Sequence, residues 1–249
     1  MKLIYKLLLT ILVLVIISTS TLFLITPKHL KNPSLDHQHL RLKLLVNGKR
    51  IDFGSQEYQK EFDKSICDNK LSSEPFHFHD NLDQYLHLHW KGLTGGDMLT
   101  YLNINNKLRA NLRTLAFRFD YFPQLQRIRT LEPKLDIEKG SSIQIYFRGY
   151  QQEQISKINI DMFKSTAITD LNKKVYSAYN KNEANNTNVA YAHEGEDDSD
   201  NQAVDSEKQK IESLLGDFVI VINKEEIKDN ELKQLFTDWI DIPESVCGG

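Results

Sequence analysis

Apolar and polar side chains alternate with a period of two residues in several stretches of this chain. In the first stretch, residues 37–46, Leu40, Leu42, Leu44 and Val46 alternate with His37, His39, Arg41 and Lys43. Successive side chains of a β-strand point to opposite faces, so this pattern predicts a strand with one buried face. The Asn-Gly pair at positions 47 and 48 predicts a hairpin turn, because a type I′ turn needs positive φ at both central residues.

The same alternation returns within residues 76–90, on both sides of a short polar segment. Aromatic or aliphatic residues occupy one set of positions and histidines the other: Phe76, Phe78, Leu86, Leu88 and Trp90 against His77, His79, His87 and His89. The intervening residues 80–83 read Asp-Asn-Leu-Asp, and Asp and Asn favour turns. We therefore predict a hairpin whose histidines all lie on one face.

Further strands are expected downstream. Residues 142–148 and 155–160 alternate on either side of Gly149 and predict a second hairpin. Residues 216–222 are almost continuously apolar and predict a buried strand.

Short helices are predicted at two places. Thr94 is followed three residues later by Asp97, which matches a capping box and predicts the start of a helix. Residues 231–239 predict a short amphipathic helix. The predicted fold class is α+β: an N-terminal transmembrane helix followed by a β-rich ectodomain of hairpins with a few short helices.

The first 26 residues differ in kind from the rest of the chain. Residues 7–25 carry no charge and are mostly Leu, Ile and Val, with Lys2 and Lys6 ahead of them. Their length is near the lower end of what crosses a bilayer as a helix, and the lysines favour an N-terminus on the cytoplasmic side. We predict a single-pass segment at residues 1–26, with the membrane as its partner through residues 7–25 and an extracytoplasmic C-terminal domain.

An uncleaved signal anchor is favoured over a cleaved signal peptide. A cleaved signal has a shorter apolar core and an Ala-x-Ala-like exit, whereas Leu-Phe-Leu-Ile at residues 22–25 continues the hydrophobic run. Residues 27–36 are then a short polar spacer between membrane and domain.

Composition and charge narrow the classes of function. The chain has 249 residues, of which 40% are apolar and 26% charged, and a net charge of −3, so it can bury a sizeable core and shows no basic surface for nucleic acid. Residues 179–210 contain hardly any large apolar side chain and predict a disordered acidic insertion. The predicted ectodomain therefore comprises residues 37–178 and 211–247.

The two cysteines, Cys67 and Cys247, leave three interpretations open. In an oxidising compartment they can form a disulfide that ties the C-terminal tail to the domain. They can also be unrelated residues, or Cys67 can be a metal ligand, since it lies ten residues before His77.

Histidine is the residue type whose placement is least random. Six of the eight histidines form three His-x-His pairs, at positions 37/39, 77/79 and 87/89, whereas random placement would give roughly 0.2 such pairs. Residues i and i+2 of a strand share a face about 6.7 Å apart, close enough for two imidazoles to converge on one ion. The pattern predicts a transition-metal site formed by His37, His39, His77, His79, His87 and His89.

Zinc and copper are the expected ions, because neutral imidazole suits both and three or four ligands complete a zinc site. Six histidines exceed one tetrahedral shell, so either two ions bind or some rings support others, with Asp80, Asp83 or Glu74 orienting the ring N–H groups. In the alternative interpretation the histidines line a solvated sheet face without metal.

The order of these motifs resembles a known layout. The chain runs from His-Gln-His-Leu through Val-Asn-Gly-Lys, a cysteine, His-Phe-His-Asp, His-Leu-His and Thr-Gly-Gly-Asp-Met-Leu to a late Gly-Asp-Phe-Val-Ile-Val-Ile strand. In this it resembles uncharacterised membrane-anchored, histidine-rich exported proteins of bacteria and archaea. The resemblance covers residues 35–105 well, and 143–160 and 216–247 more loosely. It implies export, a membrane anchor and the six paired histidines as the shared feature, but no particular chemistry.

Three functions are consistent with these sequence features. The preferred one is a membrane-anchored extracytoplasmic protein that binds a transition metal through its His-x-His pairs. The second is a zinc- or copper-dependent metalloenzyme in which Asp80 or Glu74 acts as base on a metal-bound water. The third is a metal-free structural or adhesive surface domain. No His-Glu-x-x-His helix and no nucleophile motif supports the enzyme.

Overall fold

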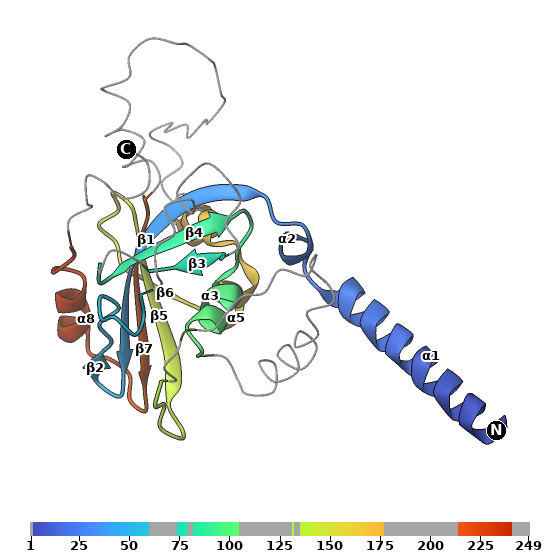
Figure 1. Cartoon of the computed structure of the whole chain (residues 1–249). Coiled ribbons are helices and arrows are strands. Elements are labelled where there is room, and N and C mark those ends of the chain that lie inside the picture. The colour runs from blue at the N-terminus through green and yellow to red at the C-terminus, as the bar shows by residue number, and fades with distance from the viewer. Residues whose placement is uncertain are drawn as a thin grey trace, which may run out of the picture.

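The structure is a computed structural model, and it describes residues 2–59, 74–78, 82–104, 131, 135–176 and 214–240 (Figure 1). Its elements follow in chain order: α1 Lys2–Ile25, α2 Lys28–Lys31, β1 Leu35–Val46, β2 Lys49–Arg50, β3 Phe76–His77, β4 Tyr85–Trp90, α3 Gly95–Tyr101, β5 Ser142–Gly149, β6 Ser156–Ile158, α5 Ile160–Ser165, the 3₁₀ helix η2 Ile168–Asp170, β7 Leu214–Asn223 and α8 Asp229–Leu235. The predicted α+β class is confirmed, with an apolar N-terminal helix ahead of a sheet-rich remainder.

The strands form one mixed sheet in the order β3-β4-β1-β7-β5-β6, with β2 paired to β1. β1 runs antiparallel to β4 but parallel to β7, which enters the sheet from the far end of the sequence. The sequence predicted hairpins, in which neighbouring strands pair antiparallel. The parallel pairing of β1 with β7 was not predicted. A parallel pair needs a long connection between its strands, so it joins distant parts of the chain.

Two apolar layers cover the sheet, one on each face. On the first face, the side chains of β1, β4 and β7 pack with α3 and α5; on the second, Leu45, Tyr146, Val219 and Val221 pack with Phe236 and α8. Figure 1 shows α3 and α5 together on one side of the sheet and α8 on the other. The two helices of the first layer touch closely, since a Cβ on Gly95 would lie 2.5 Å from the ring of Phe163.

The predicted helix start at Thr94 is confirmed. The Thr94 side chain accepts a hydrogen bond from the backbone of Asp97, and the Asp97 carboxylate accepts one from the backbone N–H of Thr94. The same carboxylate lies 2.8 Å from Nε2 of His29, in the short helix α2. This contact joins the segment after the N-terminal helix α1 to the core of the domain.

The N-terminal helix α1 is long and apolar enough to cross a membrane. Its 24 residues span about 36 Å, against about 30 Å for a bilayer's hydrocarbon core. Within the described residues, the apolar stretch Leu3–Thr21 packs against nothing, and Figure 1 shows α1 projecting away from the domain. The segment predicted as a polar spacer, residues 27–36, contains the helical turn α2, whose Leu30 is buried.

Several predicted features lie outside the described residues. These are the acidic insertion at 179–210 and the two cysteines, Cys67 and Cys247. The disulfide therefore stays a prediction, as does the disorder of the insertion.

The Asp97 carboxylate generates a pH-dependent prediction. Burial acts to raise the pKa of Asp97, but hydrogen bonds from His29 and Thr94 and the charge of His29 outweigh it and lower that pKa. A carboxyl whose pKa is lower folded than unfolded stabilises the fold above about pH 4, and that contribution is lost as the pH falls through the folded-state pKa. Asp97→Asn should therefore lower the free energy of unfolding by about 1–2 kcal/mol at pH 7.

Urea unfolding of the full chain in detergent micelles, followed by tryptophan fluorescence, measures this effect. The difference between wild type and Asp97→Asn should shrink towards pH 3. Asp161→Asn, which alters an exposed carboxylate in the first turn of α5, is the matched control and should change little. If the difference in unfolding free energy between wild type and Asp97→Asn stays constant from pH 7 to about pH 3, the charge of the Asp97 carboxylate is not what stabilises the fold.

Candidate metal centre

The histidines of three adjacent strands lie on one face of the sheet, because each strand alternates apolar and histidine positions. In the register of the strands, His87 of β4 lies opposite both His39 of β1 and His77 of β3. The residues that alternate with them, including Leu40 and Leu86, have no exposed surface and belong to the first core layer. Because neighbouring side chains of a strand point to opposite faces, the imidazoles lie on the second face of the sheet. This is the face that α8 covers farther along, beside β7 and β5.

Three of these histidines form a group that can hold a metal ion. His37, His87 and His89 each offer a ring nitrogen, and the three nitrogens lie within 4.8 Å of one another. Zinc–nitrogen bonds of about 2.0–2.1 Å place two bound nitrogens about 3.4 Å apart, so closure of this triad needs only a small side-chain adjustment. Within the described part of the chain, the group consists of imidazoles alone.

The remaining two histidines of the face touch the triad from opposite sides. The ring centre of His39 lies 4.7 Å from that of His37 and 4.5 Å from that of His87. The ring centre of His77 lies 4.6 Å from that of His89 and 5.1 Å from that of His87. Five of the six predicted ligands are thus brought together, whereas His79 lies outside the described residues.

Most of the cluster is buried. His77, His87 and His89 are 2%, 1% and 1% exposed, whereas His37 is half-buried. A buried imidazole loses its contacts with water, so polar partners or a bound cation have to replace them.

Tyr85 borders the cluster on β4. Its ring stacks on His39 with centres 5.1 Å apart and meets His87 edge-on at 5.2 Å. Burial raises the pKa of Tyr85 to about 12, although the charge of Arg41 acts in the opposite direction. The phenol therefore stays neutral at physiological pH and contributes a polar but uncharged wall.

Of the three carboxylates expected to orient the ring N–H groups, the structure describes Asp83 and Glu74. Asp83 accepts hydrogen bonds from the Arg50 side chain and from the backbone N–H of Phe53, at 3.0 Å, so it supports the turn after β1 instead. Glu74 is buried, and its charge adds to the effect of burial in raising the pKa of Tyr101, a residue of the apolar core. Asp80 is not among the described residues.

An ion-paired group that was not predicted from the sequence continues the histidine face. Asp217 of β7 is 3% exposed and accepts hydrogen bonds from Nε of Arg41 at 2.6 Å and from Nη2 of Arg148 at 2.6 Å. Arg41 follows His39 by two residues on β1, so the alternation that placed the histidines also placed this guanidinium. The sequence signal for this ion-paired group was Asp217, the one acidic residue within the apolar run 216–222.

The C-terminal helix is fastened to the same face by a buried lysine. Nζ of Lys43 donates a hydrogen bond to the carbonyl oxygen of Leu235 at 2.8 Å and lies 4.1 Å from the ring centre of Trp239. Burial, with a smaller effect of the Arg50 charge, lowers the pKa of Lys43 to about 8. These contacts hold the end of α8 beside the ion-paired group.

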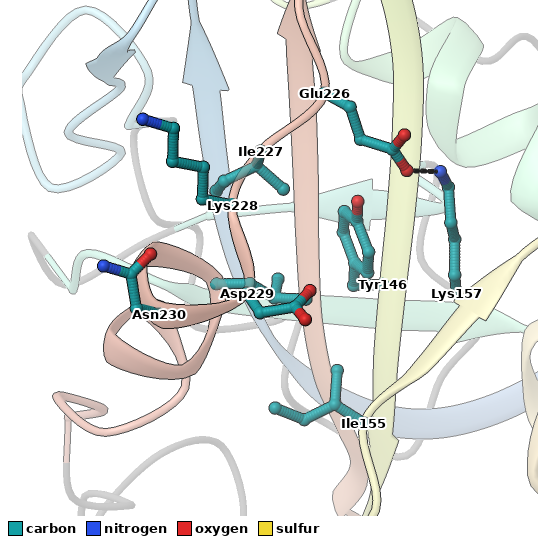
Figure 2. A pocket seen from close by; sticks show the side chains of 9 residues that line it. Tyr146, Ile155, Lys157, Glu226, Ile227, Lys228, Asp229 and Asn230 are labelled. Atoms are coloured by element: carbon teal, nitrogen blue, oxygen red, sulfur yellow. Dashed lines mark hydrogen bonds and ion pairs between the residues drawn. The ribbon is translucent and has the colours of Figure 1, made fainter.

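A shallow groove lies near the opposite edge of the sheet, beside β6 and the start of α8 (Figure 2). It contains the Lys157–Glu226 ion pair and the ring of Tyr146, whose hydroxyl donates a hydrogen bond to Gln144 at 3.0 Å. None of the predicted site residues lines this groove. The residues that line it are Tyr146, Ile155, Lys157, Glu226, Ile227, Lys228, Asp229, Asn230 and Leu232. Among the described residues, the histidine group that can hold a metal ion lies instead towards the other edge of the sheet, on β4 and β1.

Asp217→Asn is expected to lower the free energy of unfolding by about 2–4 kcal/mol, because it leaves two guanidinium groups without their buried carboxylate. Both guanidinium side chains are partly exposed, which limits the loss. Glu226→Gln breaks an exposed ion pair and is the matched control, with an expected change below about 1 kcal/mol. Equal effects of the two substitutions in urea unfolding would contradict this assignment.

Known proteins offer no relative from which a function could be transferred. No protein-family model matches the chain, and no curated protein and no solved structure is significantly similar to it. The resemblance to histidine-rich exported proteins therefore stays a prediction, and the residues of the site are the basis for any functional proposal.

Proposed function

We propose that this protein is a membrane-anchored, extracytoplasmic metal-binding protein whose ectodomain binds a transition-metal ion, zinc or copper, through paired histidines. The observation that carries the proposal is the group of half-buried His37 with buried His87 and His89, whose ring nitrogens lie within 4.8 Å of one another. His39 and His77 adjoin this group and complete a site made of imidazoles from three strands.

The ligand type supports zinc or copper. Neutral imidazole binds zinc, copper, nickel and iron, whereas calcium and magnesium prefer oxygen ligands. Among the described residues, the ligand group contains no carboxylate. Copper(II) and zinc also lie at the high-affinity end of the divalent series.

Burial supports binding over a purely structural role. Each strand of the cluster alternates, so replacing its histidines by valine or leucine would keep the strand pattern and bury more apolar surface. The grouping of five imidazoles on one face of the sheet is explained if they bind a transition metal, since imidazole is a ligand that such ions prefer. Metal binding then contributes directly to the stability of this edge of the sheet.

The anchor supports placement at a membrane. Helix α1 has the length and composition to cross a bilayer, and Lys2 and Lys6 precede its apolar stretch. Positive charge on the cytoplasmic side would place the domain on the other side of the membrane. A metal-binding domain held there would capture or sense ions from outside the cytoplasm.

A metalloenzyme is the second candidate, favoured by one observation. A group of three imidazoles leaves a fourth tetrahedral position, which is the arrangement of catalytic zinc sites. Of the two bases considered for it, Asp80 lies outside the described residues and Glu74 lies close to Tyr101 of the apolar core. Because the sequence has no His-Glu-x-x-His helix and no nucleophile motif, we prefer binding to catalysis.

Metal analysis of the full chain tests the proposal. Protein purified in detergent without a histidine tag and equilibrated with zinc or copper should retain at least one ion per chain. His87→Ala should lower the affinity for the first ion at least tenfold, because it removes the ring that contacts all the other histidines of the group. At a free metal concentration one hundred times Kd, wild type should gain about 2.7 kcal/mol of stability.

His29→Ala is the matched control for this experiment. His29 is bonded to Asp97 and belongs to no part of the cluster, so its loss should leave metal binding unchanged. Less than one tenth of an ion per wild-type chain would refute the metal-binding function and favour the metal-free structural domain.

Membrane topology is tested with alkaline phosphatase fused to the C-terminus in a bacterial host. The fusion should be active and should stay in the membrane fraction after carbonate extraction. Replacing Lys2 and Lys6 by glutamate should reduce this activity, because it removes the positive charge that retains the N-terminus inside. Loss of the first 20 or so residues, measured by intact mass, would show a cleaved signal peptide in place of the anchor.

A further inference from the structure

We infer that the domain rests on the bilayer through a small surface made of Lys28, Lys31, Leu35 and Lys91, and that this surface binds anionic phospholipid headgroups. These four residues are called the membrane-contact surface below. The inference rests on the membrane-anchored part of the proposed function, because it takes α1 to be the anchor. It adds a partner, the lipid headgroups, and an orientation of the domain on them.

The membrane-contact surface begins close to the end of α1. Helix α1 ends at Ile25 and α2 begins at Lys28. Three residues of extended chain span at most about 11 Å, and the polar layer of a bilayer is about 5–7 Å thick on each side. Because His29 is bonded to Asp97 and Leu30 is buried, α2 is held against the domain. The domain therefore meets the headgroup layer at α2.

The turn after β4 lies beside α2 although it is distant in sequence. The backbone N–H of Lys91 donates a hydrogen bond to the carbonyl oxygen of Ser34 at 2.9 Å. A Cβ on Gly92 would lie 3.5 Å from Cβ of His29. Figure 1 shows α2 at the place where α1 meets the domain. Lys91 thus joins the two lysines of α2 on one surface.

The side chains of this surface are available to a partner. Lys28 and Lys91 are exposed. Nζ of Lys31 lies 4.9 Å from the ring centre of Phe23 in the last turns of α1, so its charge lies beside the end of that helix. Among the large apolar side chains that the described residues leave exposed, Leu35, at 42%, is the one outside α1.

This combination suits a lipid surface. Lysines next to a membrane helix are attracted to anionic headgroups, and an apolar side chain among them can enter the boundary between headgroups and acyl chains. Two carboxylates in neighbouring positions are engaged within the protein. Asp36 accepts a hydrogen bond from Gln38 at 3.1 Å, and buried Asp97 faces His29. The lysines therefore determine the sign of the charge presented to the lipid.

The orientation also places the histidine cluster near the bilayer. His37 follows Leu35 by two residues on β1, and His89 precedes Lys91 by two residues at the end of β4. Two residues of a strand span about 7 Å. Anionic headgroups at that distance attract cations, so they would raise the concentration of metal ions beside the cluster.

Hydrogen exchange of the full chain in lipid nanodiscs tests the inference. One preparation contains phosphatidylcholine alone, and the other contains an equimolar mixture with phosphatidylglycerol. Backbone amides in residues 27–35 and 90–93 should exchange about threefold more slowly, or slower still, in the anionic nanodiscs, because the lysines are attracted to the headgroups. Amides of α1 should be protected equally in both.

Lys91→Glu is the decisive variant. It reverses one charge of the membrane-contact surface and is distant in sequence from α1, so insertion of the anchor is unaffected. It should remove most of the slowing that phosphatidylglycerol causes. Lys228→Glu, which alters an exposed lysine at the start of α8, is the matched control and should keep the slowing. Circular dichroism shows that each variant is folded, and Lys91→Gln replaces Lys91→Glu if that variant is not.

The possible failures are distinct. Equal exchange of residues 27–35 and 90–93 in the two lipids, or equal slowing in wild type and Lys91→Glu, would overturn binding to anionic headgroups and leave the anchor intact. Rapid exchange of residues 7–21 in both kinds of nanodisc would refute the anchor and this inference together. Loss of metal binding in detergent would refute the metal-binding function alone.

Discussion

The two-residue period of β1, β3 and β4 is the constraint on which the rest of the structure depends. One face of these strands is apolar except for Gln38 and packs against α3 and α5, so the other face has to carry the histidines. A slip of one residue would turn Leu40 and Leu86 outward and press imidazoles into the apolar layer. The burial of one face therefore fixes the register that brings His39, His87 and His77 into line.

The same face has two parts with different chemistry. At the β3–β4–β1 end it holds imidazole rings that can bind a cation, and towards β7 it holds Asp217 between two arginines. Because the arginines are already engaged with this carboxylate and with the aromatic rings of the C-terminal segment, their charge is partly neutralised beside the histidines. This arrangement permits a cation site next to basic residues, which would otherwise repel the ion.

A polar contact holds the segment that follows the apolar helix α1 against the domain. His29, four residues beyond α1, meets the carboxylate that also caps α3, while Leu30 is buried in the apolar core. The segment between α1 and the sheet is thus packed against the domain and leads directly into β1, the strand that carries two of the histidines. His37 lies twelve residues after the end of α1, so the histidine cluster is close in sequence to the apolar helix.

The sequence by itself determined the features that depend on near neighbours. Alternation predicted β1, β4 and the face of their histidines, residues 216–222 predicted β7, and Thr94 with Asp97 predicted α3, because side-chain direction and capping depend on residues a few positions away. The tertiary structure decided the parallel pairing of β1 with β7, the partners of Asp83 and Asp217, and the shift in register between Leu35 and Gln38 near His37. These contacts join residues that are distant in sequence, and their energies depend on packing that no local pattern encodes. For the same reason, the sequence could name the histidines, but only the sheet could place five of them together.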